Sequence, residues 1–413
     1  MKFKLTKLEK QWILYDVGNS AFILLVATIV PIYFNYLAEQ AGLSSVNYLA
    51  YWAYAVSAAT LIVAVLGPVL GTLADTKGFK KKLFAVAMFV GAIGCTALGF
   101  VQSWLWFLGI FVIAKVGYSV SLIFYDSMLS DVTTEERMDE VSSQGYAWGY
   151  IGSCIPFAAG LGLVLGQESL GISLPFAMGI AFVITSVWWV GVTIPLLKNY
   201  DQKHWSDPGK NAIRESFGRL YETFKDIKGQ KHIFVYLLAF FFYIDGVYTI
   251  IDMATAYGEA LGLDTTGLLL ALLVTQVVAF PFALLFGRLS KKIKAYKIIN
   301  LCIAAYFCVA LFAIQLDTQG EFWFLAVCVG MFQGTIQALS RSYFAKIIPD
   351  EKSGEYFGIL DICGKGASFM GTFLVGAVSQ LTHNVSFGVG ALAILFLIGL
   401  LLFQKAVALN PQS

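Results

Sequence analysis

The chain has 413 residues, of which 58% are apolar, 15% aromatic and 13% charged. Soluble domains carry about 25% charged residues, so roughly half the usual charge excludes a disordered, fibrous or ordinary cytosolic protein. The formal net charge of +2 is too small to indicate a nucleic-acid partner.

Long apolar stretches recur along the whole sequence, which is typical of a polytopic membrane protein. At about 20 residues a span, roughly a dozen transmembrane helices fit this length. The sequence lacks the alternating ten-residue strands of a membrane barrel. The apolar runs between charged or Gly/Pro-rich segments predict spans at 12–38, 47–73, 83–102, 104–130, 141–166, 173–197, 232–258, 265–287, 298–316, 321–345, 354–381 and 385–404.

The uneven distribution of Lys and Arg predicts how the chain is oriented in the membrane. Nearly all of these residues lie in the N-terminus, 77–82, 198–231, 288–297 and 341–352. The alternate connections contain no Lys or Arg, so both termini are predicted to face the cytoplasm. The stretch 198–231 is predicted to be a cytoplasmic linker with an amphipathic helix at 211–227. It separates an N-terminal bundle of six helices (1–197) from a C-terminal bundle of six (232–413).

The two predicted bundles resemble each other in sequence. Two pairs of segments align between them, namely GTLADTKGFKKK (71–82) with GRLSKKIKAYK (287–297), and DSMLSDVTTEER (126–137) with RSYFAKIIPDEK (341–352). In this alignment Lys291 stands where the first copy has Asp75, and Arg341 stands where it has Asp126. Parallel halves around a central pathway are a common plan of secondary transporters, with the substrate bound near the midplane.

The segment 71–82 resembles the loop signature of the major facilitator superfamily, although Thr76 stands where a basic residue is usual. Four further segments resemble the vacuole-effluxer-like branch: YDVGNSAF (15–22), SDVTTEER (130–137), YIDGVYTI (243–250) and ALSRSYFAKIIP (338–349). The best-known members of that branch are autophagy-linked amino acid exporters of fungal vacuoles, and it has many bacterial relatives. The resemblance covers nearly the whole chain. It implies an all-α integral membrane fold of twelve transmembrane helices in two pseudo-symmetric six-helix bundles. It also implies a multi-pass protein of the bacterial cytoplasmic (inner) membrane.

Charges inside the predicted spans need a reason, because a charge at a helix centre costs roughly 2.5–3.5 kcal/mol on insertion scales. Lys115 lies near the midplane of the fourth span, with Tyr118 and Asp126 on the same helical face. We expect Lys115 to face a carboxylate, a substrate anion or water. The alternative is a permanent ion pair that locks the two halves together.

The seventh span carries Asp245 and Asp252 seven residues apart, with Tyr248 between them on the same side. A carboxylate in a desolvated site can take up and release a proton near neutral pH. Asp245 is therefore the predicted proton-coupling residue. The alternative is that Asp245 stays ionised in a pair with Lys115 or Lys365.

The remaining interior polar residues complete the predicted site. Asp361 and Lys365 are spaced i,i+4, so they either pair with each other or contact substrate. Asp16 and Asn19 are predicted to line the inner cavity, unless Asp16 bonds to backbone or to the basic residues after the second span. The predicted substrate-binding residues are Lys115, Tyr118, Asp245, Tyr248, Asp252, Gln333, Asp361, Lys365, Asp16 and Asn19. The predicted gating residues are Asp75, Lys80 and Lys81, together with Asp126 and Arg341, which would pair across the halves.

These features predict a monomeric secondary transporter that binds a small molecule and works by alternating access in the lipid bilayer. Both charge signs in one cavity favour a zwitterion or small polar anion, such as an amino acid. A proton is the expected coupling ion because no motif marks a sodium site, and the resemblance implies export. Two alternatives stay open: an exporter of amphipathic drugs or lipids, and a non-transporting receptor or scaffold on the same fold. The six cysteines form no CxxC pair and the three histidines form no HExxH, so we expect no metal, cofactor or enzymatic activity.

Overall fold

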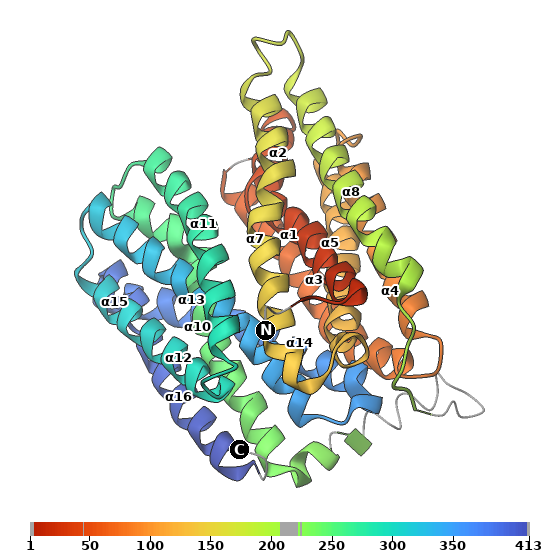
Figure 1. Cartoon of the computed structure of the whole chain (residues 1–413). Helices are drawn as coiled ribbons and strands as arrows, with labels where there is room; N and C mark the ends of the chain where they lie inside the picture. Colours follow the sequence, from red (N-terminus) through yellow and green to blue (C-terminus); the bar gives the residue numbers. More distant parts are fainter. Residues whose placement is uncertain (1–3, 44, 207–221, 224, 411–413) are drawn as a thin grey trace. The chain divides into compact units, whose positions relative to one another are not determined.

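The computed structural model is almost entirely helical (Figure 1). It describes residues 4–43, 45–206, 222–223 and 225–410. Some side chains within these ranges are not described, namely those of 45–50, 255–256, 259–260, 265–266, 269 and 365–369. Most of the amphipathic helix predicted at 211–227 lies outside the described residues. In the described part, one isolated bridge of β type joins Thr76 to Ser206.

The chain divides into two compact units, and the first comprises Met1–Thr133, Trp148–Ala212 and Glu351–Gly358. Its complete helices are α1 (Lys7–Ala27), α2 (Ile29–Gln40), α3 (Ser45–Ala74), α4 (Lys80–Leu98), α5 (Trp104–Ser127), α6 (Leu129–Val132) and α8 (Leu174–Asn199). It also contains most of α7 (Glu135–Leu165) and the first residues of α14 (Ser353–Thr382). We call it unit 1.

The second unit, unit 2, comprises Thr134–Ala147, Ile213–Asp350 and Ile359–Ser413. Its longer helices are α10 (Lys231–Ala260), α11 (Thr265–Leu289), α12 (Ala295–Phe312), α13 (Gln319–Ile347) and α16 (Leu392–Leu409). Two short elements, η1 (Ala313–Gln315) and α15 (Val385–Gly390), also belong to unit 2, whereas η2 (Asp350–Lys352) has its first residue in unit 2 and its last two in unit 1. Unit 2 also holds the first turns of α7 and most of α14. Each unit therefore contains a helical segment from the other half of the sequence.

The observed helices correspond one by one to the twelve predicted spans. Eleven apolar segments of the described chain are long enough to cross a membrane, with α1 and α2 counted together, and α14 is the twelfth helix. The largest difference from prediction is at the start of α7, which begins at Glu135 where the sequence pattern placed it at 141. Glu135 and Glu136 at the start of α7 are exposed, whereas Asp139 and Glu140 in its second turn are buried against other parts of the protein.

The first span is divided between α1 and α2 at Thr28. Pro31 has no backbone N–H, and its ring excludes the carbonyl four residues earlier, so α1 ends at Ala27. Thr28 departs from helical dihedrals, with φ −130° and ψ −73°, and its hydroxyl donates to the Leu24 carbonyl at 2.6 Å. The other end of α1 is fixed by a capping box between Thr6 and Glu9.

Glycines of α4 and α5 face each other, so the backbones of the two helices come into direct contact. A Cβ added to Gly117 of α5 would lie 2.5 Å from the Gly91 backbone nitrogen of α4. Unit 1 also has a buried aromatic core in which the Trp12 and Tyr125 rings stack at a centroid distance of 4.3 Å. Such close contacts fix the faces that α4 and α5 present to each other.

Candidate functional site

The polar patch of α1 is buried inside unit 1. Asp16 and Asn19 are 5% and 3% exposed. The Asn19 amide donates to the Tyr15 carbonyl at 3.1 Å and to Asp16 Oδ1 at 3.4 Å. The Tyr15 hydroxyl in turn hydrogen-bonds to Ser121 of α5. This patch joins α1 to α5 through side-chain hydrogen bonds.

Lys115 and Tyr118 lie one turn apart on α5. The Lys115 ammonium lies 5.4 Å from the centroid of the Tyr118 ring, a cation–π distance, and its side chain is half-buried. Tyr118 is buried and packs against Phe22 and Trp189. Asp126, further along α5, is half-buried. Helix α5 of unit 1 therefore carries both an ammonium group, on Lys115, and a carboxylate, on Asp126.

Asp245 of α10 is completely buried in unit 2. Its Oδ1 accepts a hydrogen bond from the Thr249 hydroxyl at 3.3 Å, whereas its Oδ2 has no hydrogen-bond partner among the residues that the structure describes. Helix α14 passes so closely that a Cβ added to Gly371 would lie 2.8 Å from Asp245 Oδ1. A buried carboxylate with an unpaired oxygen can bind a proton or the donor group of a ligand.

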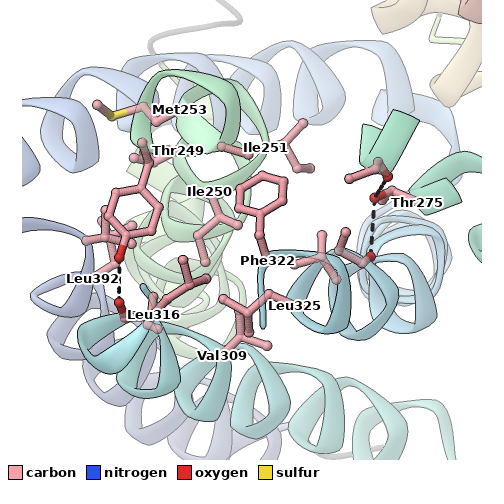
Figure 2. A pocket seen from close by; sticks show the side chains of 18 of the residues that line it. Thr249, Ile250, Ile251, Met253, Thr275, Val309, Leu316, Phe322, Leu325 and Leu392 are labelled. Carbon is pink, nitrogen blue, oxygen red and sulfur yellow. Dashed lines mark hydrogen bonds between the residues drawn. The ribbon is translucent and has the colours of Figure 1, made fainter. Parts of the chain in front are cut away.

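An apolar cavity of about 90 Å³ lies next to this carboxylate inside unit 2 (Figure 2). Thr249 links the two, because it lines the cavity and donates to Asp245. The rest of the wall is mostly aliphatic and aromatic, with Ile250, Phe322 and Leu325 among the residues drawn in Figure 2. Gln333 also lines it, and its Oε1 has no hydrogen-bond partner within the described part of the chain. The cavity thus has an apolar wall with a few polar atoms.

The other predicted site residues of unit 2 differ in exposure. Tyr248 and Asp361 are half-buried, and Asp252 is exposed. Lys365 lies within α14, but its side chain is outside the described part of the structure, so its predicted pairing with Asp361 stays a prediction. Unit 1 holds four predicted substrate-binding residues: Asp16, Asn19, Lys115 and Tyr118. Unit 2 holds Asp245, Tyr248, Asp252, Gln333 and Asp361.

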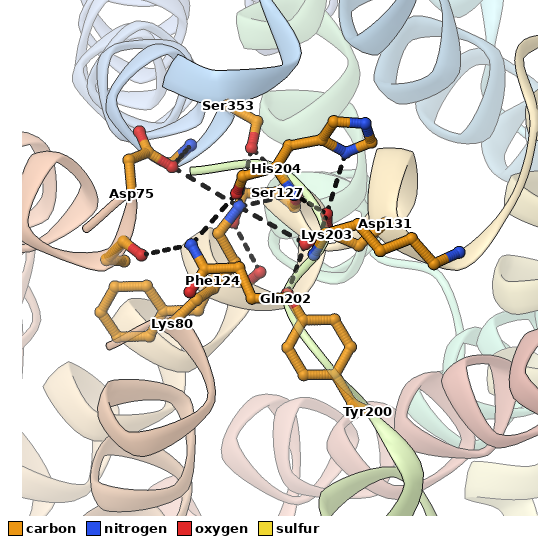
Figure 3. Close-up of polar contacts among 12 residues, drawn as sticks. Asp75, Lys80, Phe124, Ser127, Asp131, Tyr200, Gln202, Lys203, His204 and Ser353 are labelled. Atoms are coloured by element: carbon orange, nitrogen blue, oxygen red, sulfur yellow. Dashed lines mark hydrogen bonds and ion pairs between the residues drawn. The ribbon is translucent and has the colours of Figure 1, made fainter. Parts of the chain in front are cut away.

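Asp75 lies in the turn after α3 and binds the first residues of α14 (Figure 3). Its carboxylate accepts hydrogen bonds from the backbone N–H groups of Gly354 at 2.8 Å and Glu355 at 2.9 Å. Lys80 Nζ lies 3.5 Å from Asp75 Oδ1. Burial raises the pKa of Asp75 to about 6, although the charge of Lys80 and the two amides act in the opposite direction. A carboxylate at a helix N-terminus is also stabilised by the helix dipole.

Lys80 is fully buried and connects three parts of unit 1. Its ammonium donates to Ser353 Oγ at 2.8 Å and to the Ser127 carbonyl at 3.3 Å, and it lies 3.8 Å from Asp131 Oδ2. We call Asp75, Lys80, Asp131 and Ser353 the Asp75 cluster. Lys81, also predicted to act in gating, is half-buried.

Asp131 binds the segment that follows α8. It accepts hydrogen bonds from the Tyr200 hydroxyl at 2.5 Å and from the backbone N–H groups of Lys203 at 3.0 Å and His204 at 2.9 Å. The His204 ring nitrogen Nδ1 lies 3.0 Å from the same carboxylate. Burial, followed by the charge of Asp131, raises the pKa of Tyr200 well above its ordinary value. Sequence reasoning missed this role of Asp131, although it lies in the quoted segment SDVTTEER.

A second cluster of charges lies at the first turns of α7, inside unit 2. Lys346 Nζ lies 2.8 Å from Asp139, and Ser342 donates to Asp139 at 2.7 Å. Lys291 forms an ion pair with Glu140. Arg341 donates to the Ser142 hydroxyl at 2.9 Å and to its carbonyl at 3.1 Å, and lies over the Tyr146 ring. We call Asp139, Glu140, Lys291, Arg341 and Lys346 the Asp139 cluster. Sequence reasoning missed Asp139 and Glu140, whose acidic spacing at a helix start was the available signal.

Neither cluster is arranged as a metal centre. Among the residues that the structure describes, no group of three or more His, Cys, Asp or Glu side chains could hold a metal ion.

The chain matches the family model described as "Vacuole effluxer Atg22 like" over residues 6–136 and 130–410. It is 41% identical over 407 residues to the "Uncharacterized MFS-type transporter YxiO" of Bacillus subtilis, covering 97% of this chain and 95% of that protein. It is also 24% identical over 367 residues to "Autophagy-related protein 22" of Saccharomyces cerevisiae, covering 77% of this chain and 65% of that protein.

Solved transporters share the fold. The E. coli fucose:proton symporter FucP superimposes with a TM-score of 0.74 at 16% sequence identity, covering 97% of both chains. The proton:xylose symporter XylE superimposes with a TM-score of 0.68 at 14% identity, covering 97% of this chain and 94% of that one. At such identity the likeness concerns the fold, and it confirms the predicted twelve-helix fold of the major facilitator superfamily.

Proposed function

The chain belongs to the vacuole effluxer Atg22-like family, and from this premise we propose that it moves a small polar or zwitterionic metabolite by alternating access. Family and fold make it a multi-pass membrane transporter of the major facilitator type and not an enzyme. The proposed membrane is the bacterial cytoplasmic membrane, in keeping with the bacterial relative of 41% identity. The proposed direction is export, in keeping with the description of the family as effluxers. The proposed active form is a monomer.

The proposed substrate is amino acid-like because both charge signs occur among the buried and half-buried polar residues of the spans. Unit 1 offers the Lys115 ammonium and the Asp16 carboxylate, and unit 2 offers the Asp245 carboxylate. A zwitterion needs a partner for its carboxylate and another for its ammonium group. Tyr118, Tyr248, Asp252, Gln333, Asp361 and Lys365 remain proposed substrate contacts, as does Asn19 beside Asp16.

Asp245 is the proposed proton-coupling residue, and its unpaired Oδ2 is the observation that carries this proposal. The bulk solvent does not reach this oxygen, and Thr249 supports only the other one. A carboxylate in this state gains from binding a proton, and a substrate that competes for the same oxygen would couple its own movement to that proton.

A second candidate function is the export of amphipathic molecules, and the apolar cavity of unit 2 is what favours it. An apolar ligand gains free energy by leaving water for such a wall. The Asp245 carboxylate favours the zwitterion instead, because an apolar ligand offers no donor group to its Oδ2.

Transport by proteoliposomes under an imposed pH gradient tests the proposal. Radiolabelled amino acids should accumulate only when the gradient is present, and Asp245→Asn should abolish this gradient-driven accumulation while exchange continues. The matched control is Asp264→Asn, because Asp264 caps α11 at an exposed position and Asn caps helices as well as Asp does. Full gradient-driven accumulation by Asp245→Asn would contradict the coupling role. Flux of lipophilic cations in place of amino acids would favour the second candidate.

The Asp75 cluster is proposed to stabilise one state of the alternating-access cycle, in keeping with the likeness of 71–82 to the superfamily's loop signature. Asp75 and Lys80 lie on segments of the first sequence half, yet they bind Ser353, Gly354 and Glu355 of the second half. A movement that separates these segments must break three hydrogen bonds to charged groups. Asp126 and Arg341 remain a proposed gating pair.

A further inference from the structure

The apolar cavity of unit 2 is too large to be an ordinary packing defect. Protein interiors are packed so closely that voids larger than a water molecule are few. This cavity has a volume of about 90 Å³ (Figure 2). A single water needs about 10–15 Å³ of such space, so there is room for roughly six waters. The lining atoms lack partners on one side, and a ligand that fills the space restores those contacts.

The space exists because small side chains stand where larger ones would fill it. Five of the lining residues are alanines, contributed by α10, α11, α12, η1 and α13, namely Ala254, Ala271, Ala310, Ala313 and Ala326. Around them the wall is made of larger apolar side chains, among them Leu316, Phe322 and Leu392. A cavity lined in this way stays dry, and it can bind a ring of the size of benzene. The wall therefore favours a compact apolar molecule over water.

The polar atoms of the wall favour a molecule that also carries a hydrogen-bond donor. The three hydroxyl groups of the wall already donate to acceptors of the protein, namely Thr249 to Asp245 Oδ1 at 3.3 Å, Tyr257 to the Ala313 carbonyl at 2.6 Å and Thr275 to the Ala271 carbonyl at 2.9 Å. Gln333 is 4% exposed, and its Oε1 has no hydrogen-bond partner among the described residues. A buried acceptor without a donor is costly. An N–H or O–H group on the ligand would remove this cost.

The cavity is built by one unit of the protein. All of its lining residues belong to unit 2. In transporters made of two halves, the transported substrate binds where the halves meet. A ligand held by the helices of a single unit can stay bound while the halves move, so the cavity suits a resident ligand.

We propose that this cavity is a binding site for a compact aromatic molecule with one hydrogen-bond donor, of about the size of indole. The ring fills the space beside the alanines, and its N–H group donates to Gln333 Oε1. Thr249 of the same wall donates to Asp245, so the site is one hydrogen bond away from the proposed proton-coupling residue. The proposal concerns binding and does not depend on either proposed transport function.

Binding of tritiated indole to the purified protein in detergent tests this site. Bound indole is counted by scintillation proximity on beads that hold the protein, and the signal left by excess unlabelled indole measures partition into the micelles. The parent protein should bind indole saturably. Indene has the same fused-ring shape without the N–H group, so it should displace indole less well than unlabelled indole does. The absence of saturable binding would overturn the proposal, whatever the outcome of transport assays.

The place of binding is tested by filling the cavity. Ala271 is completely buried in the wall, and Ala271→Leu should abolish saturable binding because the larger side chain occupies the space. The matched control is Ala408→Leu, which makes the same change at an exposed position of α16 in the same unit and should bind as the parent does. Melting curves show whether each variant folds, and Ala326→Leu fills the same space from α13 if Ala271→Leu does not fold. Saturable binding at the parent level by a folded, filled variant would overturn the site.

The hydrogen bond is tested by Gln333→Leu, which removes the acceptor and keeps a side chain of similar size. This change should reduce the advantage of indole over indene about fivefold, the effect of one hydrogen bond. An unchanged advantage would overturn the role of Gln333. Better displacement of indole by 1-dodecanol than by indene would overturn the choice of a compact ring, since a lipid-like chain would then be the preferred occupant.

Discussion

Two buried carboxylates of this protein differ in how well their oxygens are satisfied. Asp75 binds two backbone N–H groups and an ammonium, whereas Asp245 binds one hydroxyl and has an unpaired Oδ2 in the described structure. A buried polar atom without a partner is costly, because its hydration is lost and not replaced. The satisfied residue suits a structural contact, and the unsatisfied one suits a reversible partner such as a proton or a substrate donor.

The pH dependence of stability should reveal the titration of Asp75. Burial raises its pKa in the folded protein from 3.8 to about 6, so the folded protein holds this proton more tightly than the unfolded chain does. Its contribution to the free energy of unfolding is therefore fully present below about pH 4 and is lost as the pH rises through about 6. Asp75→Asn cannot titrate at this position. The melting temperature of the wild type minus that of Asp75→Asn should accordingly fall as the pH rises from about 4 to about 7.

This measurement is made in detergent micelles at constant salt, and the other titrating groups cancel in the difference. One pKa unit corresponds to about 1.4 kcal/mol, so the whole effect is limited to a few kcal/mol. A difference that stays constant or grows with pH would contradict the raised pKa of Asp75.

Individual polar residues could be singled out from the sequence, whereas the residues that they bind could not. Asp245 stood out because a charge inside an apolar span is costly, and Asp75 and Lys80 stood out because the segment 71–82 resembles the superfamily's loop signature. Asp131, Asp139 and Glu140 did not stand out, because they lie in polar segments where charges are common. Their partners Tyr200, Lys291 and Lys346 are distant in sequence, and no local spacing connects them.

At the scale of the element, helix boundaries follow local chemistry that can be read in advance. The capping boxes at Thr6–Glu9 and Thr318–Glu321 mark the starts of α1 and α13, and Pro31 marks the break between α1 and α2. The early start of α7 could not be read in this way. Its first turns carry Asp139 and Glu140, which are buried and pair with Lys346 and Lys291 from distant parts of the sequence.

The α4–α5 contact gives a prediction for one helix. Gly117→Ala should lower the melting temperature, because the new Cβ would lie 2.5 Å from the Gly91 nitrogen and 2.8 Å from the Ala87 carbonyl oxygen. Overpacking of this kind typically lowers the free energy of unfolding by about 2 kcal/mol. Gly109→Ala, on the same helix with nothing within 4 Å, is the control. There alanine should stabilise by about 0.5–1 kcal/mol through helix propensity. Similar melting temperatures for the two variants would show that α4 and α5 do not meet at Gly117.

At the scale of the whole molecule, the two units share segments between the sequence halves. Glu351–Gly358 belongs to unit 1, and Thr134–Ala147 belongs to unit 2. The bundles predicted at 1–197 and 232–413 remain the proposed moving bodies, because chain connectivity makes α7 and α14 part of opposite halves. Each exchanged segment carries part of one cluster, because Glu351–Gly358 contains Ser353 and Thr134–Ala147 contains Asp139 and Glu140.

The orientation of the whole chain can be tested by labelling from each side of the membrane. Lys82→Cys and Ser169→Cys both place a thiol at an exposed position, the first in the basic stretch after α3 and the second between α7 and α8. Because basic connections stay in the cytoplasm, impermeant maleimide should label Lys82→Cys in inside-out vesicles and Ser169→Cys in right-side-out vesicles. The reverse pattern would place the termini outside, and labelling of both from one side would contradict the count of spans between them.

The contact of Gly71 with Gly354 bears on how quickly the protein can change state. Where two helices meet through glycines, no side chains interdigitate, so the surfaces can part without any rotamer having to change. The activation barrier proposed for parting then resides mainly in the adjacent hydrogen bonds of Asp75 to the Gly354 and Glu355 amides and of Lys80 to Ser353, since these are the strong directional interactions there. Bulkier residues at this contact would have to change rotamer whenever the helices part, so the glycine pair is expected to make the proposed change of state faster.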